Sequence, residues 1–303
     1  MNRFRRDGIP TFIHIEKTGG TSLVELLRCS FPLSHCDLLP IEHFGMLANE
    51  KDIRLAKWFH PGFKSLAGHC LRPYNDVGAF TSQLDMYVLF RDPVDRYISD
   101  FNHDRLQRSY TGSIEDWMQY DDKHDFQTRA IAGRPSLEDA IEILNDRVRL
   151  VGTLDDYDSF FQQLVHQFKG KLLGQIVKKN TSENLQSVNK TEQLPVKRSA
   201  LSSSTLKKIE SVNAMDSALI KYVRESLLPV QNMEYSKREC TYRDVSSSMM
   251  NFRLKSYLVK RNFIYKPALG YRPLKGTGLL RHTMNSKDYY EKYQSQESGV
   301  RET

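Results

Sequence analysis

The chain has 303 residues, of which 39% are hydrophobic and 27% are charged, and its formal net charge is +7. This length suits a single α/β domain with a sizeable core, and the four cysteines lack the paired spacing of a disulfide framework or a zinc ribbon. No apolar run reaches the roughly 18 residues of a membrane span, and the N-terminus leaves no room for a signal peptide, so we expect a cytoplasmic protein without a transmembrane segment.

The first predicted element is a strand that runs into a glycine turn and then a helix. Residues 12–15 are mostly apolar, Gly19 and Gly20 follow, and apolar residues then recur at helical spacing (Leu23, Leu26, Leu27 and Phe31). Such a junction presents unpaired backbone N–H groups at the positive end of a helix dipole, and Lys17 adds a full charge. The segment predicts a site for a phosphate-like anion. The alternative is an ordinary strand–turn–helix junction with an incidental lysine.

A Walker loop would place a lysine after its glycines, whereas here the lysine comes first. The order Lys-Thr-Gly-Gly-Thr-Ser after a strand resembles the 5′-phosphosulfate loop of sulfotransferases, which use 3′-phosphoadenosine 5′-phosphosulfate (PAPS). The resemblance implies a P-loop-like, doubly wound parallel sheet flanked by helices. It assigns Lys17 to the leaving phosphate oxygen, and it implies cofactor contacts from Lys17, Thr18, Gly19, Gly20, Thr21 and Ser22.

A short strand is predicted over residues 64–70, and it contains the pair Gly68-His69 near its end. A histidine at a strand end is often held by a backbone carbonyl. Histidine is also the usual general base near neutral pH, and a hydroxyl that attacks sulfur has to lose its proton to such a base. His60 and His103 are the competing candidates for this role.

Residues 86–90 predict another buried strand, and a helix is predicted to begin at Pro93 with Asp92 as its N-cap. Arg91 then lies at the strand tip, and Ser99 lies two turns into the helix. An arginine in this place, together with a serine hydroxyl, can bind a phosphate. A capping ion pair of the arginine and a solvated serine are the alternative.

The run from Arg91 to His103, with Ser99 at the matching distance, resembles the glycan sulfotransferases that modify heparan and chondroitin sulfate at 2-O and 6-O positions. In that family the Arg–Ser pair binds the 3′-phosphate of PAPS, and a Gly-His at the place of His69 carries the catalytic base. The resemblance implies in-line transfer of the sulfuryl group to an acceptor hydroxyl on a carbohydrate, without a metal and with 3′-phosphoadenosine 5′-phosphate (PAP) as product. Glu16 departs from the family, which commonly carries Pro or Gln there, and it is expected to need a partner such as Arg72.

Alternation of strands and helices continues beyond residue 110. Residues 136–147 predict an amphipathic helix, residues 149–154 predict a strand, and the helix that follows has an apolar side (Phe160, Phe161, Leu164, Val165 and Phe168). This alternation predicts a doubly wound parallel sheet, which binds ligands at the carboxyl ends of its strands. One long helix is predicted over residues 204–228.

Residues 174–204 are polar and aperiodic, as in a functional or disordered loop. Within them, residues 188–192 resemble a segment of the glycan 2-O-sulfotransferases that closes over the nucleotide. The resemblance makes Lys190 and Thr191 candidate cofactor contacts, and a solvated loop is the alternative.

The excess positive charge lies at the C-terminal end. Residues 246–303 contain eleven Lys and Arg against four Asp and Glu, interleaved with aromatic residues. We expect a sulfotransferase domain over residues 1–245 and a basic, aromatic-containing C-terminal extension over residues 246–303. The extension could attract a polyanionic acceptor or make peripheral contact with an anionic membrane surface, or it could be a solvated tail. No nucleic acid partner is expected, because no readout motif is present.

The motifs together predict a PAPS-dependent sulfotransferase, and two alternatives remain. A nucleotide-dependent phosphotransferase would need a Walker lysine and a Mg²⁺-binding aspartate after a later strand, and neither is arranged in that way. A catalytically inactive glycan- or nucleotide-binding module on the same fold would not require Lys17 or His69, yet both are present. The motifs do not specify the acceptor.

Overall fold

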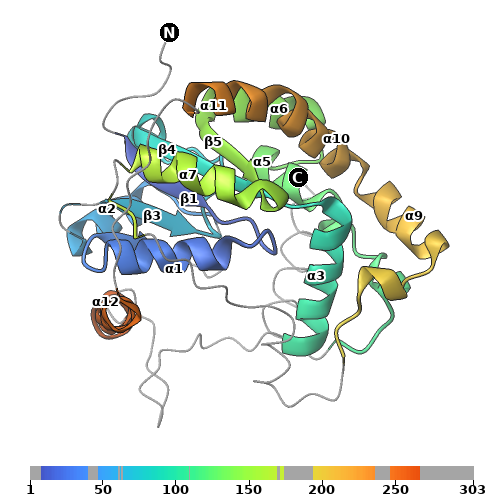
Figure 1. Ribbon diagram of the computed structural model, residues 1–303, viewed down its shortest axis with the longest axis horizontal. Helices are drawn as coiled ribbons and strands as arrows, with labels where there is room; N and C mark the ends of the chain where they lie inside the picture. Colours follow the sequence, from blue (N-terminus) through green and yellow to red (C-terminus); the bar gives the residue numbers. More distant parts are fainter. Residues whose placement is uncertain are drawn as a thin grey trace, which may run out of the picture. The chain divides into compact units, whose positions relative to one another are not determined.

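The computed structural model describes residues 8–39, 47–60, 62, 64–108, 110–168, 171–173, 194–235 and 246–266. The chain divides into two compact units, Met1–Leu254 and Lys255–Thr303. The first unit contains a parallel sheet flanked by helices, as predicted (Figure 1). The domain boundary expected at residue 245 stays a prediction. Lys190, Thr191 and most of the basic extension lie outside the described residues.

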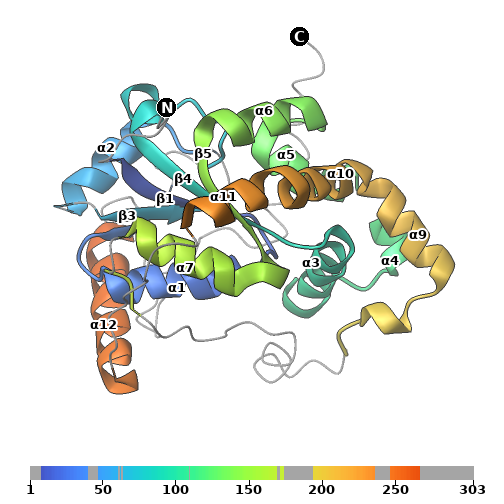
Figure 2. The same cartoon turned by 45° about the horizontal axis from the view of Figure 1, so that its top comes forward.

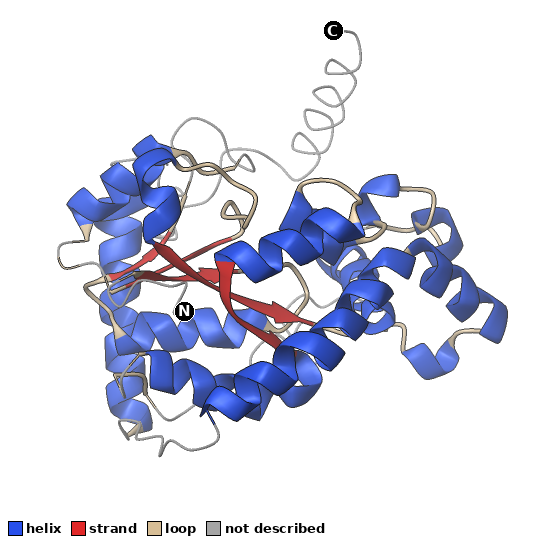
Figure 3. Ribbon diagram, turned by 90° about the horizontal axis from the view of Figure 1, so that it is seen from above, coloured by secondary structure: helices blue, strands red, loops and turns tan. Residues whose placement is uncertain are grey.

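The sheet has five parallel strands in the order β2-β3-β1-β4-β5. Their bounds are β1 Ile9–Ile13, β2 His35–Asp37, β3 Ser65–Gly68, β4 Leu84–Phe90 and β5 Val148–Thr153. All seven residues of β4 are buried, as expected for a parallel strand that is covered on both faces. Figure 3 shows the strands between two layers of helices.

The structure describes α-helices between and after these strands. They are α1 Gly20–Ser30, α2 Glu50–Phe59, α3 Pro93–Gln107, α4 Ile114–Trp117, α5 Phe126–Ala132, α6 Leu137–Arg147, α7 Tyr157–Gln167, α9 Ser203–Val212, α10 Ala214–Tyr222, α11 Leu228–Tyr235 and α12 Ser247–Lys260. No described helix is both long and apolar enough to cross a membrane.

The hydrophobic core on one face of the sheet is formed by α1 and α7 packing on the central strands. Its buried members include Phe12, Leu23, Leu26, Leu27, Tyr87, Leu89, Leu150, Phe160 and Leu164. The apolar side chains that the sequence places on one face of each helix therefore face the sheet, as the helical spacing predicts. This packing fixes where α1 begins relative to the end of β1.

The predicted start of α3 is confirmed, but the long helix predicted over residues 204–228 is interrupted. The Asp92 side chain accepts a hydrogen bond from the Asp95 amide at 3.1 Å, and Pro93 is the first helical residue. Asn213 separates α9 from α10, and its side-chain amide donates to the Ile209 carbonyl at 2.8 Å. An asparagine that bonds its own backbone competes with the helix, which explains the break (Figure 2).

Two aspartates cap α5 and α10 reciprocally. The Asp216 carboxylate, fully buried, accepts from the amides of Gln127 (3.0 Å) and Thr128 (2.7 Å) at the start of α5. The Asp125 carboxylate accepts from the amides of Met215 (2.8 Å) and Asp216 (3.1 Å) at the start of α10. Each helix therefore supplies the cap of the other, and their N-termini are fixed together.

A Ser–His–Asp chain links α1 to β2 and β3. His35 contacts the Ser65 hydroxyl at 2.8 Å through Nδ1 and Asp37 at 3.1 Å through Nε2, and Arg28 binds the same Asp37 at 2.7 Å. The order resembles that of a hydrolase triad. His35 and Ser65 are fully buried, however, so no substrate reaches the serine. The hydrogen bonds among the three side chains serve to hold the sheet together.

Candidate functional site

The carboxyl ends of β3, β1 and β4 lie side by side at one edge of the sheet. Ile13 pairs with Gly68 of β3 on one side and with Val88 of β4 on the other. The chain leaves β1 toward β2 and leaves β4 toward β5, in opposite directions along the sheet. This reversal is the switch point at which open α/β sheets bind ligands.

The loop between β1 and α1 has the backbone that a glycine-rich anion loop requires. Lys17 (φ 66°) and Gly19 (φ 87°) are left-handed, and Gly19 precedes α1 without a side-chain cap. The Thr18 hydroxyl donates to the Ile15 carbonyl at 3.0 Å and holds the loop against the strand. The first N–H groups of α1 thus lack a capping side chain, which suits an anion at this end of the helix.

Both glycines are required by close packing. A Cβ added at Gly19 would lie 2.7 Å from the Leu154 side chain, and one added at Gly20 would lie 2.5 Å from the His14 ring. Either contact is closer than real Cβ atoms approach, so a neighbouring side chain or the loop would have to shift, and at Gly19 the left-handed backbone (φ 87°) would strain any other residue as well. Steric crowding by neighbouring side chains therefore explains why both positions are glycine.

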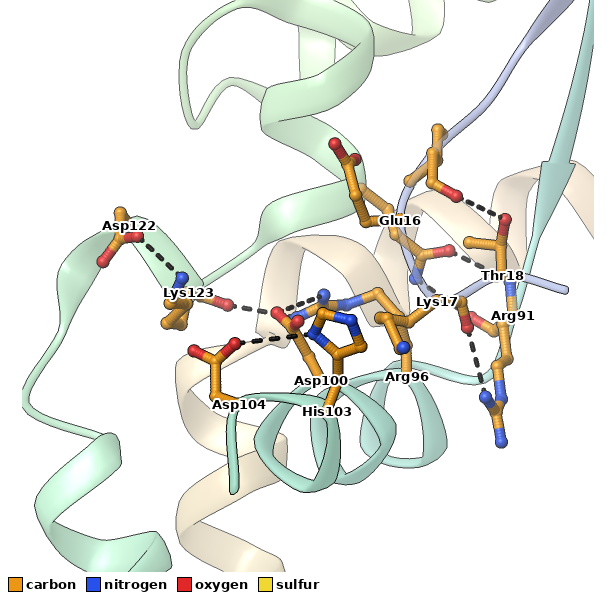
Figure 4. A network of polar contacts seen from close by, with 12 residues as sticks. Glu16, Lys17, Thr18, Arg91, Arg96, Asp100, His103, Asp104, Asp122 and Lys123 are labelled. Carbon is orange, nitrogen blue, oxygen red and sulfur yellow. Dashed lines mark hydrogen bonds and ion pairs between the residues drawn. The ribbon is translucent and has the colours of Figure 1, made fainter. Parts of the chain in front are cut away.

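Arg91 follows β4 directly and is held from two sides. Its Nη1 donates to the Lys17 carbonyl at 3.1 Å, which joins the strand tip to the loop (Figure 4). The Gln127 side chain accepts from the Arg91 amide at 2.9 Å and donates to the Arg91 carbonyl at 2.9 Å. Because Gln127 lies at the start of α5, the capped helix fixes the backbone of the arginine. Sequence patterns gave no signal for this glutamine.

The charges of Lys17 and Arg91 are partly desolvated. Burial lowers the pKa of Lys17; Asp100 and Asp104 oppose this shift, whereas Arg91 adds to it. Burial also lowers the pKa of Arg91. Among the described residues no carboxylate lies within 4.0 Å of either cation. A bound anion would recover the hydration that both groups lose, so the pair favours a negatively charged ligand.

His69 lies at the end of β3, next to the end of β1. Its Nδ1 lies 2.8 Å from the His14 carbonyl, and its ring stacks on the His14 ring at 4.0 Å between centroids. A carbonyl can only accept, so Nδ1 carries the proton and Nε2 of the neutral ring has a free lone pair. The His69 side chain is 54% exposed, so a ligand can reach it. The competing His60 is 1% exposed.

Glu16 is paired with Arg72, as expected for an acid beside the loop lysine. Its two carboxylate oxygens accept from Arg72 Nη2 at 2.9 and 3.1 Å. Burial alone would raise the pKa of Glu16, but the charges of Arg72 and His69 outweigh it and lower the pKa to about 2. The carboxylate is therefore ionised at physiological pH. Burial raises the pKa of the adjacent Cys70 thiol to about 12, so that thiol is not a nucleophile.

Three of the remaining predicted contacts lie on helices that follow β1 and β4. Thr21 and Ser22 are partly exposed in the first turn of α1, and Ser99 is partly exposed on α3. The structure thus brings Lys17 into contact with Arg91, and it places Ser99 on the helix that follows. Lys190 and Thr191, outside the described residues, stay predictions.

A group of possible metal ligands on α3 was not predicted from the sequence. One donor atom from each of Asp100, His103 and Asp104 lies within 4.8 Å of the others (Figure 4). Their i, i+3, i+4 spacing could have revealed the group. Asp100 is paired with the fully buried Arg96 at 3.2 Å, and Asp104 is paired with Arg108 at 3.0 Å. The two carboxylates are already balanced by guanidinium groups, and the expected absence of a metal stays a prediction.

Comparisons with known proteins give little beyond the geometry. No family model and no curated protein sequence matches this chain. Among solved structures, the chain is similar to mouse sulfotransferase SULT7A1 complexed with PAP, with 15% sequence identity and a TM-score of 0.38 over 77% of this chain and 90% of that one.

The Glu16–Arg72 pair predicts a pH-dependent stability difference. The folded-state pKa of Glu16 is about 2, below its ordinary value of 4.5, so the pair stabilises the fold above pH 4.5 and loses this effect as the pH falls toward 2. We expect Glu16→Gln to lower the free energy of unfolding at neutral pH, and the difference from the wild type to shrink through that window. Urea unfolding at several pH values measures it, with the exposed Glu138→Gln as control. A difference that stays constant with pH would contradict the pairing.

The two hydrogen bonds between the Gln127 side chain and the Arg91 backbone predict that the Arg91 amide exchanges faster when Gln127 is removed. Gln127→Ala removes the acceptor of the Arg91 amide, so we expect hydrogen exchange at Arg91 to accelerate about tenfold. Residue-resolved exchange by NMR tests this, with Gln119→Ala as a control at an exposed glutamine. Unchanged exchange at Arg91 would show that the Gln127 side chain does not hold the tip of β4.

Proposed function

We propose that this chain is a sulfotransferase that moves the sulfuryl group of PAPS to an acceptor hydroxyl. The observation that carries the proposal is the junction of two partly desolvated cations, Lys17 and Arg91, at the uncapped start of α1. Arg91 donates to the Lys17 carbonyl. No described carboxylate forms an ion pair within 4.0 Å of either charge, although Asp100 and Asp104 act on Lys17, and Asp92 and Asp95 on Arg91, from a greater distance. A ligand with two separate phosphate groups fits such a pair of cations on neighbouring strands.

The loop side would take the 5′-phosphosulfate. Backbone N–H groups from Thr18 to Thr21, with the hydroxyls of Thr21 and Ser22, would hold the phosphate. The Lys17 ammonium would stabilise the charge that grows on the bridging oxygen as the S–O bond breaks. Supporting this, the left-handed Lys17 and Gly19 open the loop at the helix start.

The strand-tip side would take the 3′-phosphate, which distinguishes PAPS from ATP. Arg91 would bind that phosphate, with Ser99 on α3 as its hydroxyl partner. Two fixed points at opposite ends of the nucleotide would set its register, and positioning supplies much of the rate in transfers of this kind. Lys190 and Thr191 are further proposed contacts to the nucleotide.

His69 would act as the general base. Its Nε2 lone pair is free in the neutral ring, because the His14 carbonyl holds the Nδ1 proton. The acceptor oxygen would attack sulfur from the side opposite the leaving phosphate as its proton moves to Nε2. PAP would leave as the product, and the proposal involves no metal.

We propose a carbohydrate as the acceptor class. The support is the run Arg91–His103, which resembles glycan sulfotransferases in residues that surround the site. The basic extension would favour an acidic glycan by long-range attraction. A cytoplasmic location is part of the same proposal.

The first test is calorimetric titration with PAP and with Mg²⁺–ATP. We expect PAP to bind with micromolar affinity, more tightly than ATP, and Arg91→Ala to weaken it at least tenfold because a charge-assisted contact is lost. Arg54→Ala, an exposed arginine paired with Glu50, is the matched control. Preference for ATP would favour the phosphotransferase, and absence of any nucleotide binding would refute the sulfotransferase.

The second test separates an enzyme from an inactive module. We expect His69→Ala to bind PAP like the wild type while transfer from labelled PAPS falls by about 10²- to 10⁴-fold, because only the base is lost. Lys17→Ala should lower both binding and transfer. A panel of oligosaccharide and simple alcohol acceptors is the readout. Wild-type protein that binds PAP and transfers to none of them would indicate a binding module.

A further inference from the structure

Glu16 stands beside the lysine of an anion loop, where a carboxylate opposes the ligand. The structure shows that its charge is directed elsewhere. Glu16 contacts Arg72 and His69, both in the segment after β3. The adjacent Lys17 instead contacts Arg91, because its carbonyl accepts a hydrogen bond from the arginine. The Glu16 carboxylate therefore lies on the side of the site that contains His69 and Arg72.

Arg72 holds this carboxylate in one place. Its Nη2 donates to both oxygens of Glu16, at 2.9 and 3.1 Å, and its side chain is 11% exposed. An arginine that binds a carboxylate within a largely buried setting restricts both side chains. Glu16 is thus an oriented group rather than a mobile surface acid.

The fixed carboxylate lies next to the ring nitrogen that carries the His69 proton. The distance from Glu16 Oε1 to His69 Nδ1 is 3.4 Å, and the His14 carbonyl accepts from the same nitrogen at 2.8 Å. The carbonyl takes the hydrogen bond and sets the tautomer, while the carboxylate adds a full negative charge beside it. The opposite nitrogen, Nε2, remains available to a substrate.

Two other titratable groups around His69 carry no charge. His14 stacks on the ring from the end of β1, and burial holds its pKa well below the ordinary value, so it stays neutral. Cys70, the next residue on the chain, keeps its proton because burial raises its pKa to about 12. Glu16 is in direct contact with Nδ1 of this ring, and the opposing charge of Arg72 is paired with Glu16.

We propose that Glu16 is a positioning residue for His69, and that its carboxylate stabilises the imidazolium formed during transfer. This inference rests on the proposed sulfotransferase function. In the step, the acceptor O–H proton moves to His69 Nε2 as the acceptor O–S bond forms, and the bond from sulfur to the phosphate oxygen breaks to release PAP. The ring becomes positively charged while Nδ1–H still bonds the His14 carbonyl, and Glu16 balances that charge without accepting a proton.

The reactivity of His69 tests the pair without any acceptor. Diethyl pyrocarbonate modifies neutral imidazole, and peptide mass spectrometry follows His69 between about pH 5 and 8. Removing the neighbouring negative charge favours the neutral ring, so Glu16→Gln should move the half-maximal labelling to lower pH by about half a unit or more. Glu138→Gln, an exposed glutamate on α6, should leave it unchanged.

A second variant covers the case in which Glu16→Gln does not fold because Arg72 loses its partner. Glu16→Gln/Arg72→Gln removes both charges, and it should move the labelling in the same direction because Glu16 is the group in contact with the ring. Half-maximal labelling at the same pH in wild type and in the folded variants would overturn the proposal.

Activity and binding separate this proposal from the function on which it rests. With PAPS and an active acceptor, Glu16→Gln should lower kcat about tenfold at high pH, extend activity to lower pH and leave PAP affinity unchanged. A merely structural loss would lower the rate without moving the pH profile. PAP binding without a labelling shift overturns the role of Glu16 alone. A labelling shift without PAP binding supports the pair and refutes the sulfotransferase.

Discussion

The site depends on the hydrogen bonding of one central strand. β1 pairs in parallel with β3 on one side and with β4 on the other, and Ile13 lies opposite both Gly68 and Val88. Because parallel strands end at the same edge, the residues that follow these strands meet there. A slip of the register between β1 and β4 would separate Lys17 from Arg91. A slip between β1 and β3 would separate the stacked rings of His14 and His69.

Two neighbouring residues of one loop serve opposite halves of this edge. Lys17 joins Arg91 after β4 through its carbonyl, and Glu16 joins Arg72 and His69 after β3 through its carboxylate. The positive half suits an anionic ligand, whereas the negative charge of Glu16 lies beside the His69 ring. An acid one residue from an anion loop is tolerated because Arg72 compensates it locally.

The sequence predicted the features that depend on local pattern, and it missed those that depend on the fold. Strands β1, β3, β4 and β5, the cap at Asp92 and the two glycines follow from periodicity, capping and backbone freedom, whereas the short strand β2 was not predicted. Nothing local marks Gln127, whose role exists only because α5 lies beside the tip of β4. The break at Asn213 was missed because the apolar spacing continues across it, and tertiary caps then decide the boundary.

The left-handed backbone of Lys17 has a consequence for how this position can change. A non-glycine residue at φ 66° costs about 1–2 kcal/mol, and a glycine there would relieve that strain. The same change would remove the ammonium group from the loop. Under the proposed function, fold stability and ligand affinity would therefore favour different residues at this one position.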